Sequence, residues 1–274
     1  MSKTHNNSIT HKLINKICDG RLTLESGVAV STTDQTAKTV VYFTPYNGNT
    51  IGLYDGSEWD LFSFTELSLS LSGYTANTNY DIFIYDNSGT LTLESIAWTN
   101  DTTRATSLVT QDGVYVKSGV TTRRYLGTIR ITGTTGQCED SASTRFLWNY
   151  YNQVQRPLYA TKVLNHTYTS ATIRPWGNVT TVGETRYQFV LGLSSLTTHY
   201  HRNWSRIMYV GLALDSTTTS NALTYNQNTA GLYSHMAAYN VYPSDGYHYI
   251  QAVEYTDSAA GASYSVTIDG TILG

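Results

Sequence analysis

Hydrophobic and polar side chains alternate along most of the chain with a period of two residues, which is typical of half-buried β-strands. The longest such run covers residues 62–71, with Phe and Leu set against Ser and Glu. We interpret this run as one strand with a single solvent-facing side. Residues 80–85 are apolar on both faces, which predicts a strand in the middle of a sheet.

Glycine-containing pairs separate these runs and predict where the chain turns. Asn47-Gly48 and Asp55-Gly56 supply the positive φ angles that tight hairpins need, and Gln111-Asp112-Gly113 repeats the signal. Asn87-Ser88-Gly89 predicts another turn. Asp269-Gly270 is interpreted as the turn that follows the last strand, and Asp81 is likewise attributed to a turn context.

Residues 141–152 fit two patterns, because the aromatic side chains there have both strand-like and helical spacing. We favour an extended passage. The segment ends at Arg156-Pro157, since the residue before a proline is pushed to an extended conformation. This is the predicted domain boundary. Short alternating runs resume beyond it, as in residues 207–212 and 247–254, and are typical of a sandwich or jelly roll.

The predicted fold class is all-β, with two β-sandwich or jelly-roll-like domains at residues 21–157 and 158–274 and a short N-terminal arm at residues 1–20. In the arm, Ile9, Leu13, Ile14 and Ile17 fall near one side of a short helix or extended segment. Such a segment is not stable alone. It either folds back on the body of the protein or serves as a particle-docking arm on a neighbouring subunit.

Composition supports the β assignment and excludes several partners. The chain has 23 Tyr among 274 residues, 14% charged residues and a net charge of -3. Its 17 basic residues are scattered, so no nucleic acid partner is expected. No secretory signal and no run of eighteen apolar residues occurs, so no membrane insertion is expected. Cys18 and Cys138 are expected to be free thiols.

No motif in the sequence indicates catalysis or a cofactor, and we expect none. His199 and His201 would share one face of a strand, the spacing of many metal sites, although an ordinary histidine pair is the favoured interpretation. Glu139 and Asp140 are adjacent, so they cannot act as an acid–base pair for glycoside cleavage. The arginines at 104, 123 and 124 could grip an acidic partner, but a structural role is favoured.

The remaining candidate chemistry is aromatic. Tyrosine rings give large contact area at low entropic cost, which suits subunit interfaces or stacking on sugar rings. Tyr200, His201 and Trp204 lie beside a polar turn in the second domain. We take these three residues as the candidate receptor contact.

Several runs of sequence resemble a module found in many tailed-phage and prophage virion proteins. Within residues 20–157 the resemblance is carried by VYFTPYNGN (41–49), LYDG (53–56), DGVYVKSG (112–119), TRRYLGT (122–128), EDS (139–141), RF (145–146) and WNYYN (148–152). A second, weaker match to a domain that often follows rests on VGL (210–212), LDST (214–217) and GYHY (246–249). The C-terminus is shorter and differs from that pattern, so the resemblance does not define the outer surface of this domain.

The resemblance implies a structural particle component, assembled in the host cytoplasm and located in the virion. We expect a tail or head fibre protein that takes part in host attachment. The alternatives are a capsid decoration protein and a collar or baseplate subunit, with a polysaccharide depolymerase as a remote third. The expected partners are other virion proteins, a host surface glycan and the chain itself, as a homotrimer, because fibre proteins commonly close around a threefold axis.

Overall fold

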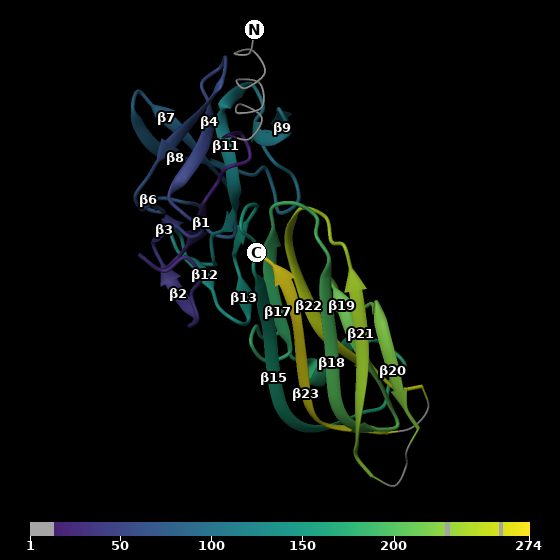
Figure 1. The fold of residues 1–274 in the computed structure, drawn as a ribbon. Coiled ribbons are helices and arrows are strands. Elements are labelled where there is room, and N and C mark those ends of the chain that lie inside the picture. The colour runs from purple at the N-terminus through teal and green to yellow at the C-terminus, as the bar shows by residue number, and fades with distance from the viewer. Residues whose placement is uncertain (1–13, 228–230, 258–259) are drawn as a thin grey trace. The chain divides into compact units, whose positions relative to one another are not determined.

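The computed structural model describes residues 14–227, 231–257 and 260–274, and nearly all of its regular structure is β (Figure 1). The fold class predicted from alternation is confirmed. The chain divides into two compact units. The first contains residues up to 140 together with 146–154 and Gly274, and the second contains 141–145 and 155–273. The division at 154/155 lies close to the predicted boundary at Pro157. No pattern in the sequence indicated that residues 141–145 belong to the second unit while 146–154 belong to the first.

The first unit contains four groups of paired strands. Its sheets are β1-β3-β6, β8-β7-β11-β10-β9 with β14 paired to β11, the pair β4-β5, and the pair β2-β12. The strands are β1 (Gly20–Thr23), β2 (Gln35–Lys38), β3 (Val40–Pro45), β4 (Thr50–Tyr54), β5 (Trp59–Ser63), β6 (Leu67–Ser70), β7 (Asn79–Asn87), β8 (Thr90–Ala97), β9 (Leu108–Gln111), β10 (Val114–Lys117), β11 (Val120–Arg130), β12 (Cys138–Asp140) and β14 (Leu147–Asn149).

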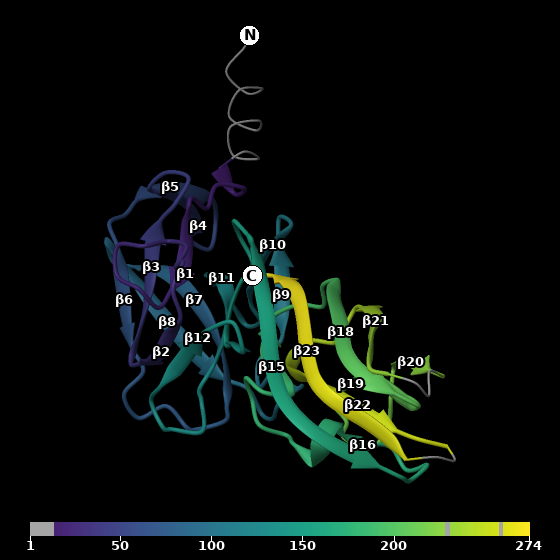
Figure 2. The same cartoon turned by 90° about the horizontal axis from the view of Figure 1, so that it is seen from below.

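The second unit is a sandwich of two sheets. One sheet has the order β13-β17-β22-β19-β20 with β16 paired to β22, and the other has the order β15-β23-β18-β21. The elements are β13 (Thr144–Arg145), β15 (Gln155–Tyr168), β16 (Arg174–Pro175), the 3-10 helix η1 (Trp176–Asn178), β17 (Arg186–Leu191), β18 (Thr197–Arg206), β19 (Met208–Leu214), β20 (Ala222–Asn226), β21 (Tyr233–Val241), β22 (Gly246–Tyr255) and β23 (Gly261–Leu273). Strands β15 and β23 run side by side in both views (Figure 2).

Three of the predicted hairpin turns are present in the first unit. Asp112 and Gly113 have φ angles of 51° and 78° between β9 and β10, and Ser88 and Gly89 have 54° and 92° between β7 and β8. The chain also turns between β4 and β5, where the Asp55 carboxylate accepts the backbone N–H groups of the two residues that precede β5. β7 lies between β8 and β11, as predicted for a strand apolar on both faces.

Three turn and strand predictions in the first unit are wrong. Asn47-Gly48 joins β3 and β4, which lie in different sheets, so it closes no hairpin. Residues 62–71 form the end of β5 and all of β6, because the phase of alternation shifts after Phe64 and the Glu66 carboxylate accepts hydrogen bonds from three neighbours outside either strand. Asp81 lies within β7, 2% exposed and paired to Arg104 at 2.7 Å.

Asp269 and Gly270 lie inside β23, not in a turn. A Cβ atom at Gly270 would stand 2.5 Å from the carbonyl oxygen of Thr198 and 2.9 Å from Nδ1 of His199 on the neighbouring β18. The glycine is therefore needed for close approach between strands, which a sequence cannot distinguish from a need for positive φ. The correction matters because it places the Asp269 side chain on a sheet face.

The described end of the N-terminal arm is attached to the first unit. The backbone N–H of Gly52 donates to the carbonyl of Ile17 at 3.0 Å, and a Cβ at Gly52 would stand 2.1 Å from the Ile14 carbonyl oxygen. Ile14 and Ile17 are both half-buried there, against β4. Ile9 and Leu13 lie outside the described residues. Residues from Ile14 onward therefore belong to the first unit, whereas the predicted arm extended to residue 20.

Buried polar groups complete the first unit. Arg124 is 1% exposed and donates to the carbonyl of Gly52 at 2.6 Å, and Arg123 pairs with Glu94 at 2.8 Å. Together with the ion pair of the arginine at 104, these contacts confirm the structural role favoured for the three arginines. Cys18 and Cys138 are buried free thiols, and burial raises the pKa of Cys18 to about 11.

Candidate functional site

The outer face of the sheet β15-β23-β18-β21, the face turned away from the second sheet of its unit, carries the candidate receptor residues. Successive side chains of β18 point to opposite sides of the sheet. Tyr200 is half-exposed and Trp204 is 52% exposed, both on the outer face, whereas His201 between them is fully buried on the inner face. The predicted group of three is therefore corrected: His201 cannot touch a receptor, because the sandwich interior surrounds it.

His199 is also buried on the inner face, so the expectation that it shares a face with His201 is confirmed. Its Nδ1 lies 2.8 Å from the hydroxyl of Tyr187, and its Nε2 lies 2.8 Å from the hydroxyl of Thr197. Burial lowers the pKa of each histidine to about 3, so both rings are neutral at pH 7. Within residues 14–227, 231–257 and 260–274, no group of three or more His, Cys, Asp or Glu could hold a metal ion.

Strand register brings distant residues into rows on the outer face. Asp269 of β23 is the Cα partner of Tyr159 on one side and of Tyr200 on the other. The next row along the strands places Arg202 between Thr267 and Met236. The row beyond it contains Val163, Ser265, Trp204 and Ser234.

One ion pair lies in the middle of this face. Nη1 of Arg202 lies 3.2 Å from Oδ1 of Asp269, and Nη2 donates to Oδ2 at 3.4 Å. Burial raises the pKa of Asp269, and the Arg202 charge acts in the opposite direction. The two side chains are 54% and 26% exposed; the Oδ1 atom of Asp269 is buried, so a ligand can reach the guanidinium of Arg202 and the Oδ2 atom of Asp269.

An apolar hollow of about 430 Å³ adjoins Trp204 at one end of the face. It is lined by Trp204, Leu232, Tyr264 and Ser265. Leu232, Tyr264 and the nearby Met236 are between 41% and 58% exposed. Large apolar side chains gathered on one face of a sheet indicate a contact surface.

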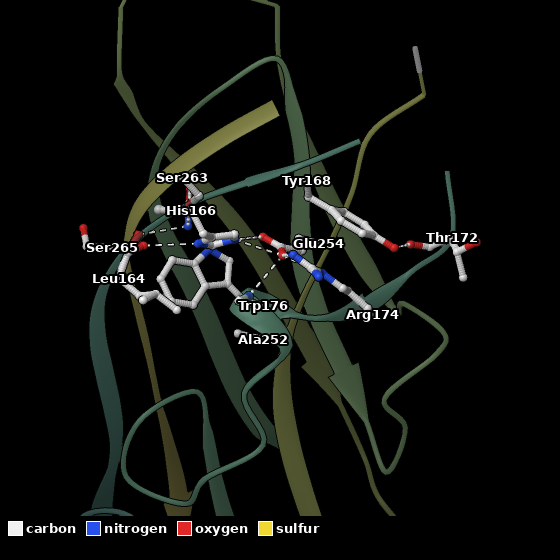
Figure 3. A network of polar contacts seen from close by, with 12 residues as sticks. Leu164, His166, Tyr168, Thr172, Arg174, Trp176, Ala252, Glu254, Ser263 and Ser265 are labelled. Atoms are coloured by element: carbon white, nitrogen blue, oxygen red, sulfur yellow. Dashed lines mark hydrogen bonds and ion pairs between the residues drawn. The ribbon is translucent and has the colours of Figure 1, made fainter. Parts of the chain in front are cut away.

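A second polar cluster lies inside the same unit, around the buried Glu254 of β22, and includes His166 of β15 (Figure 3). Its carboxylate, fully buried, lies between the His166 ring and the Arg174 guanidinium, with distances of 2.7 Å from Nε2 and 2.8 Å from Nη2. The backbone N–H of Gly177 donates to it at 3.0 Å. Burial alone lowers the pKa of His166, but the hydrogen bond and charge of Glu254 raise it above the usual value.

This Glu254 cluster is suited to holding the structure together and not to catalysis. Three groups occupy the carboxylate oxygens, and Arg174 also stacks 3.7 Å from the ring centroid of Tyr168. A general acid or base needs a vacant position facing its substrate. The cluster joins β15, β16 and β22, which fixes one end of the sandwich.

Sequence reasoning missed three residues of the outer face, namely Tyr159, Arg202 and Asp269. Alternation within β18 contained a signal for Arg202, since it lies two residues from Tyr200 on the same face. Tyr159 and Asp269 are separated from Tyr200 by 41 and 69 positions, and no local pattern reveals that their strands are neighbours.

Comparisons with known proteins add little to this geometry. No protein-family model matches the chain, and no curated protein matches it significantly. Among solved structures, a BuGH86 variant in complex with neoagarooctaose has a TM-score of 0.28 and 9% identity, over 88% of this chain and 34% of that one. The insecticidal delta-endotoxin Cry8Ea1 from Bacillus thuringiensis has 0.27 and 8%, over 97% and 55%.

A calcium-binding mutant of Bacteroides uniformis beta-glucuronidase 2 has a TM-score of 0.21 and 8% identity, over 84% of this chain and 27% of that one. The chain thus spans between about a quarter and about half of these proteins. At these TM-scores the likeness carries no argument about function. No helix within the described ranges is long and apolar enough to cross a membrane.

Proposed function

We propose that the protein is a non-catalytic structural subunit of a tailed-phage particle, a fibre component that contributes to host attachment through the outer face of its second unit. The observation that carries the attachment role is the gathering of Tyr159, Tyr200 and Trp204 around the Arg202–Asp269 pair. Aromatic rings beside polar side chains recur in surfaces that bind sugars and proteins. The particle assignment rests on the resemblance of residues 20–157 to phage virion modules.

The absence of catalysis is part of this proposal. The buried carboxylates of Asp81 and Glu254 are each occupied by an arginine, so neither is available as an acid or a nucleophile. Glu139 and Asp140 follow each other in β12 and point to opposite faces. Release of reducing ends from host polysaccharide, abolished by changing one Asp or Glu, would overturn this part.

Particle composition and cell binding test the proposal together. Quantitative mass spectrometry of purified particles measures the copies of this protein relative to the major capsid protein. A fibre subunit is far less numerous than a decoration protein, which would coat the capsid. Purified protein should bind host cells, and Trp204→Ala should weaken this binding without a large fall in Tm. Absence from the particles, or a copy number matching the capsid lattice, contradicts the fibre assignment.

A further inference from the structure

We propose that the row of Tyr159, Asp269 and Tyr200, together with Arg202 of the next row, binds a neutral glycan chain, with Asp269 as the residue that determines specificity. This inference rests on the proposed attachment function and names its ligand class. In Figure 1 the four strands that carry the row and its surroundings, β15, β23, β18 and β21, lie side by side in one sheet.

The spacing of the row suits a ring-shaped ligand. Tyr159 and Tyr200 lie on either side of Asp269 in direct cross-strand register. Neighbouring strands are about 4.8 Å apart, so the two tyrosines start roughly 9.6 Å from each other. The carboxylate lies between two aromatic side chains that extend from the same face.

The chemistry of the row matches a sugar hydroxyl pair. Asp269 accepts hydrogen bonds and Arg202 donates them, and the two groups lie within 3.4 Å of each other. Each hydroxyl of a pyranose both donates and accepts, so two adjacent hydroxyls can bond to the pair at once. The tyrosine rings stack on the apolar C–H face of the sugar, which aligns those hydroxyls with the pair.

Charge selects a neutral ligand over an anionic one. The guanidinium is already balanced by the carboxylate, so a uronate or sulfate would have to compete with Asp269 for Arg202 and would be repelled by it. The outward neighbours of the pair are uncharged: the hydroxyls of Thr161 and Thr267 on one side, and Met236 and Ala238 on the other. The net charge of -3 adds to this repulsion.

The row continues towards Trp204, which favours a chain of several sugar units over a single one. Trp204 follows Tyr200 by four residues on the same strand face, a distance of roughly 13 Å. Between them lies Arg202. A glycan that stacks on Tyr200 can thus extend along β18 to the exposed indole, with the pair beside its first units.

Titration calorimetry with the full chain tests the inference. The probes are oligosaccharides of dextran, mannan and galactan as neutral ligands, and of hyaluronan and polygalacturonate as anionic ones. We expect binding to a neutral probe and not to the anionic ones. Asp269→Asn and Tyr159→Ala should each weaken it by about tenfold or more, as expected when a ligand's polar or stacking partner is removed. Tyr242→Ala, at a tyrosine that is 68% exposed but outside the sheet, is the matched control.

The outcomes separate this inference from the proposed function. Preference for an anionic probe, or equal losses with Tyr242→Ala, overturns the neutral row. Binding to host cells without binding to any neutral probe overturns the inference and leaves the attachment function standing. Absence of cell binding overturns both. Unchanged Tm values for the two variants show that a loss of binding is not a loss of folding. If Asp269→Asn lowers the Tm, the binding measured for Tyr159→Ala decides whether the inference stands.

Discussion

At the scale of single residues, the buried histidines of β18 make stability depend on pH. The pKa of His201 falls from 6.5 in the unfolded chain to about 3 in the folded one because of burial, and neither ring nitrogen has a hydrogen-bond partner among the described residues. Below pH 6.5 the unfolded chain therefore binds a proton that the folded chain does not. Stability should fall by about 1.4 kcal/mol per pH unit for this residue as the pH drops from 6.5 towards 3.

Replacing His201 by Leu removes both the pH-dependent loss of stability and the buried ring that has no hydrogen-bond partner. We expect urea unfolding at pH 5 to show a larger gain in stability for the variant than unfolding at pH 7.5, by about 2 kcal/mol. Comparing the variant with the wild type at each pH cancels the contributions of His199 and His166. An equal difference at both pH values would contradict a neutral, buried His201.

The carboxylate of Glu254 provides a second residue-scale prediction. Glu254→Gln leaves Arg174 and His166 partly buried without their anion, so we expect a loss of about 3 kcal/mol in the free energy of unfolding. The matched control is Glu184→Gln, which removes a more exposed ion pair with Lys162 (2.7 Å) and should change stability by less than about 1 kcal/mol. Similar effects of the two changes in chemical denaturation would show that burial of Glu254 does not matter.

At the scale of elements, close approach of β23 to β18 requires glycine. Gly270→Ala places a methyl group 2.5 Å from the carbonyl oxygen of Thr198, which is too close, so the strands must separate. We expect a loss of about 1–3 kcal/mol, measured by thermal or denaturant unfolding. Gly133→Ala is the control, because nothing lies within 4 Å of its Cβ position and its φ is not positive. An unchanged free energy of unfolding for Gly270→Ala would mean that the two strands can move apart without a loss of stability.

The N-terminal arm remains the predicted particle-docking element, and a deletion tests this role. Cys18 is buried and Ile17 bonds to β4, so a deletion through residue 18 would damage the first unit itself. Deleting residues 2–13 spares these contacts. We expect the shortened protein to fold with an unchanged Tm and to be missing from particles made in a complementation assay. Normal incorporation would exclude the arm as the docking element.

At the scale of the whole molecule, exposed apolar side chains support the proposed homotrimer. Outside the candidate binding residues, Val163, Met236 and Tyr242 are each more than half exposed, and an interface between subunits would remove them from water. Light scattering at micromolar concentration should give three times the chain mass of 30.4 kDa. A monomeric mass would contradict the prediction. These side chains would then be available for contacts with ligands or other virion proteins.

Much of the local structure followed from the sequence. Alternation established the all-β class, the apolar run at residues 80–85 predicted the central β7, and the pair Asp112-Gly113 predicted a turn with positive φ at both residues. Each of these features depends on backbone preferences and side-chain periodicity within a few residues. For the candidate receptor contact, the sequence named Tyr200 and Trp204 correctly as aromatics that are at least partly exposed but grouped them with His201, which lies on the opposite face.

Tertiary structure alone decided which residues of different strands meet. Asp269 was interpreted as a turn residue, yet register with β15 and β18 places it between Tyr159 and Tyr200. The same packing turned His201 inwards and made Gly270 a point of close approach instead of a bend. The physical reason is that strand order and register depend on burial across the entire sandwich, between segments tens to more than a hundred residues apart, whereas the sequence pattern acts over a single strand.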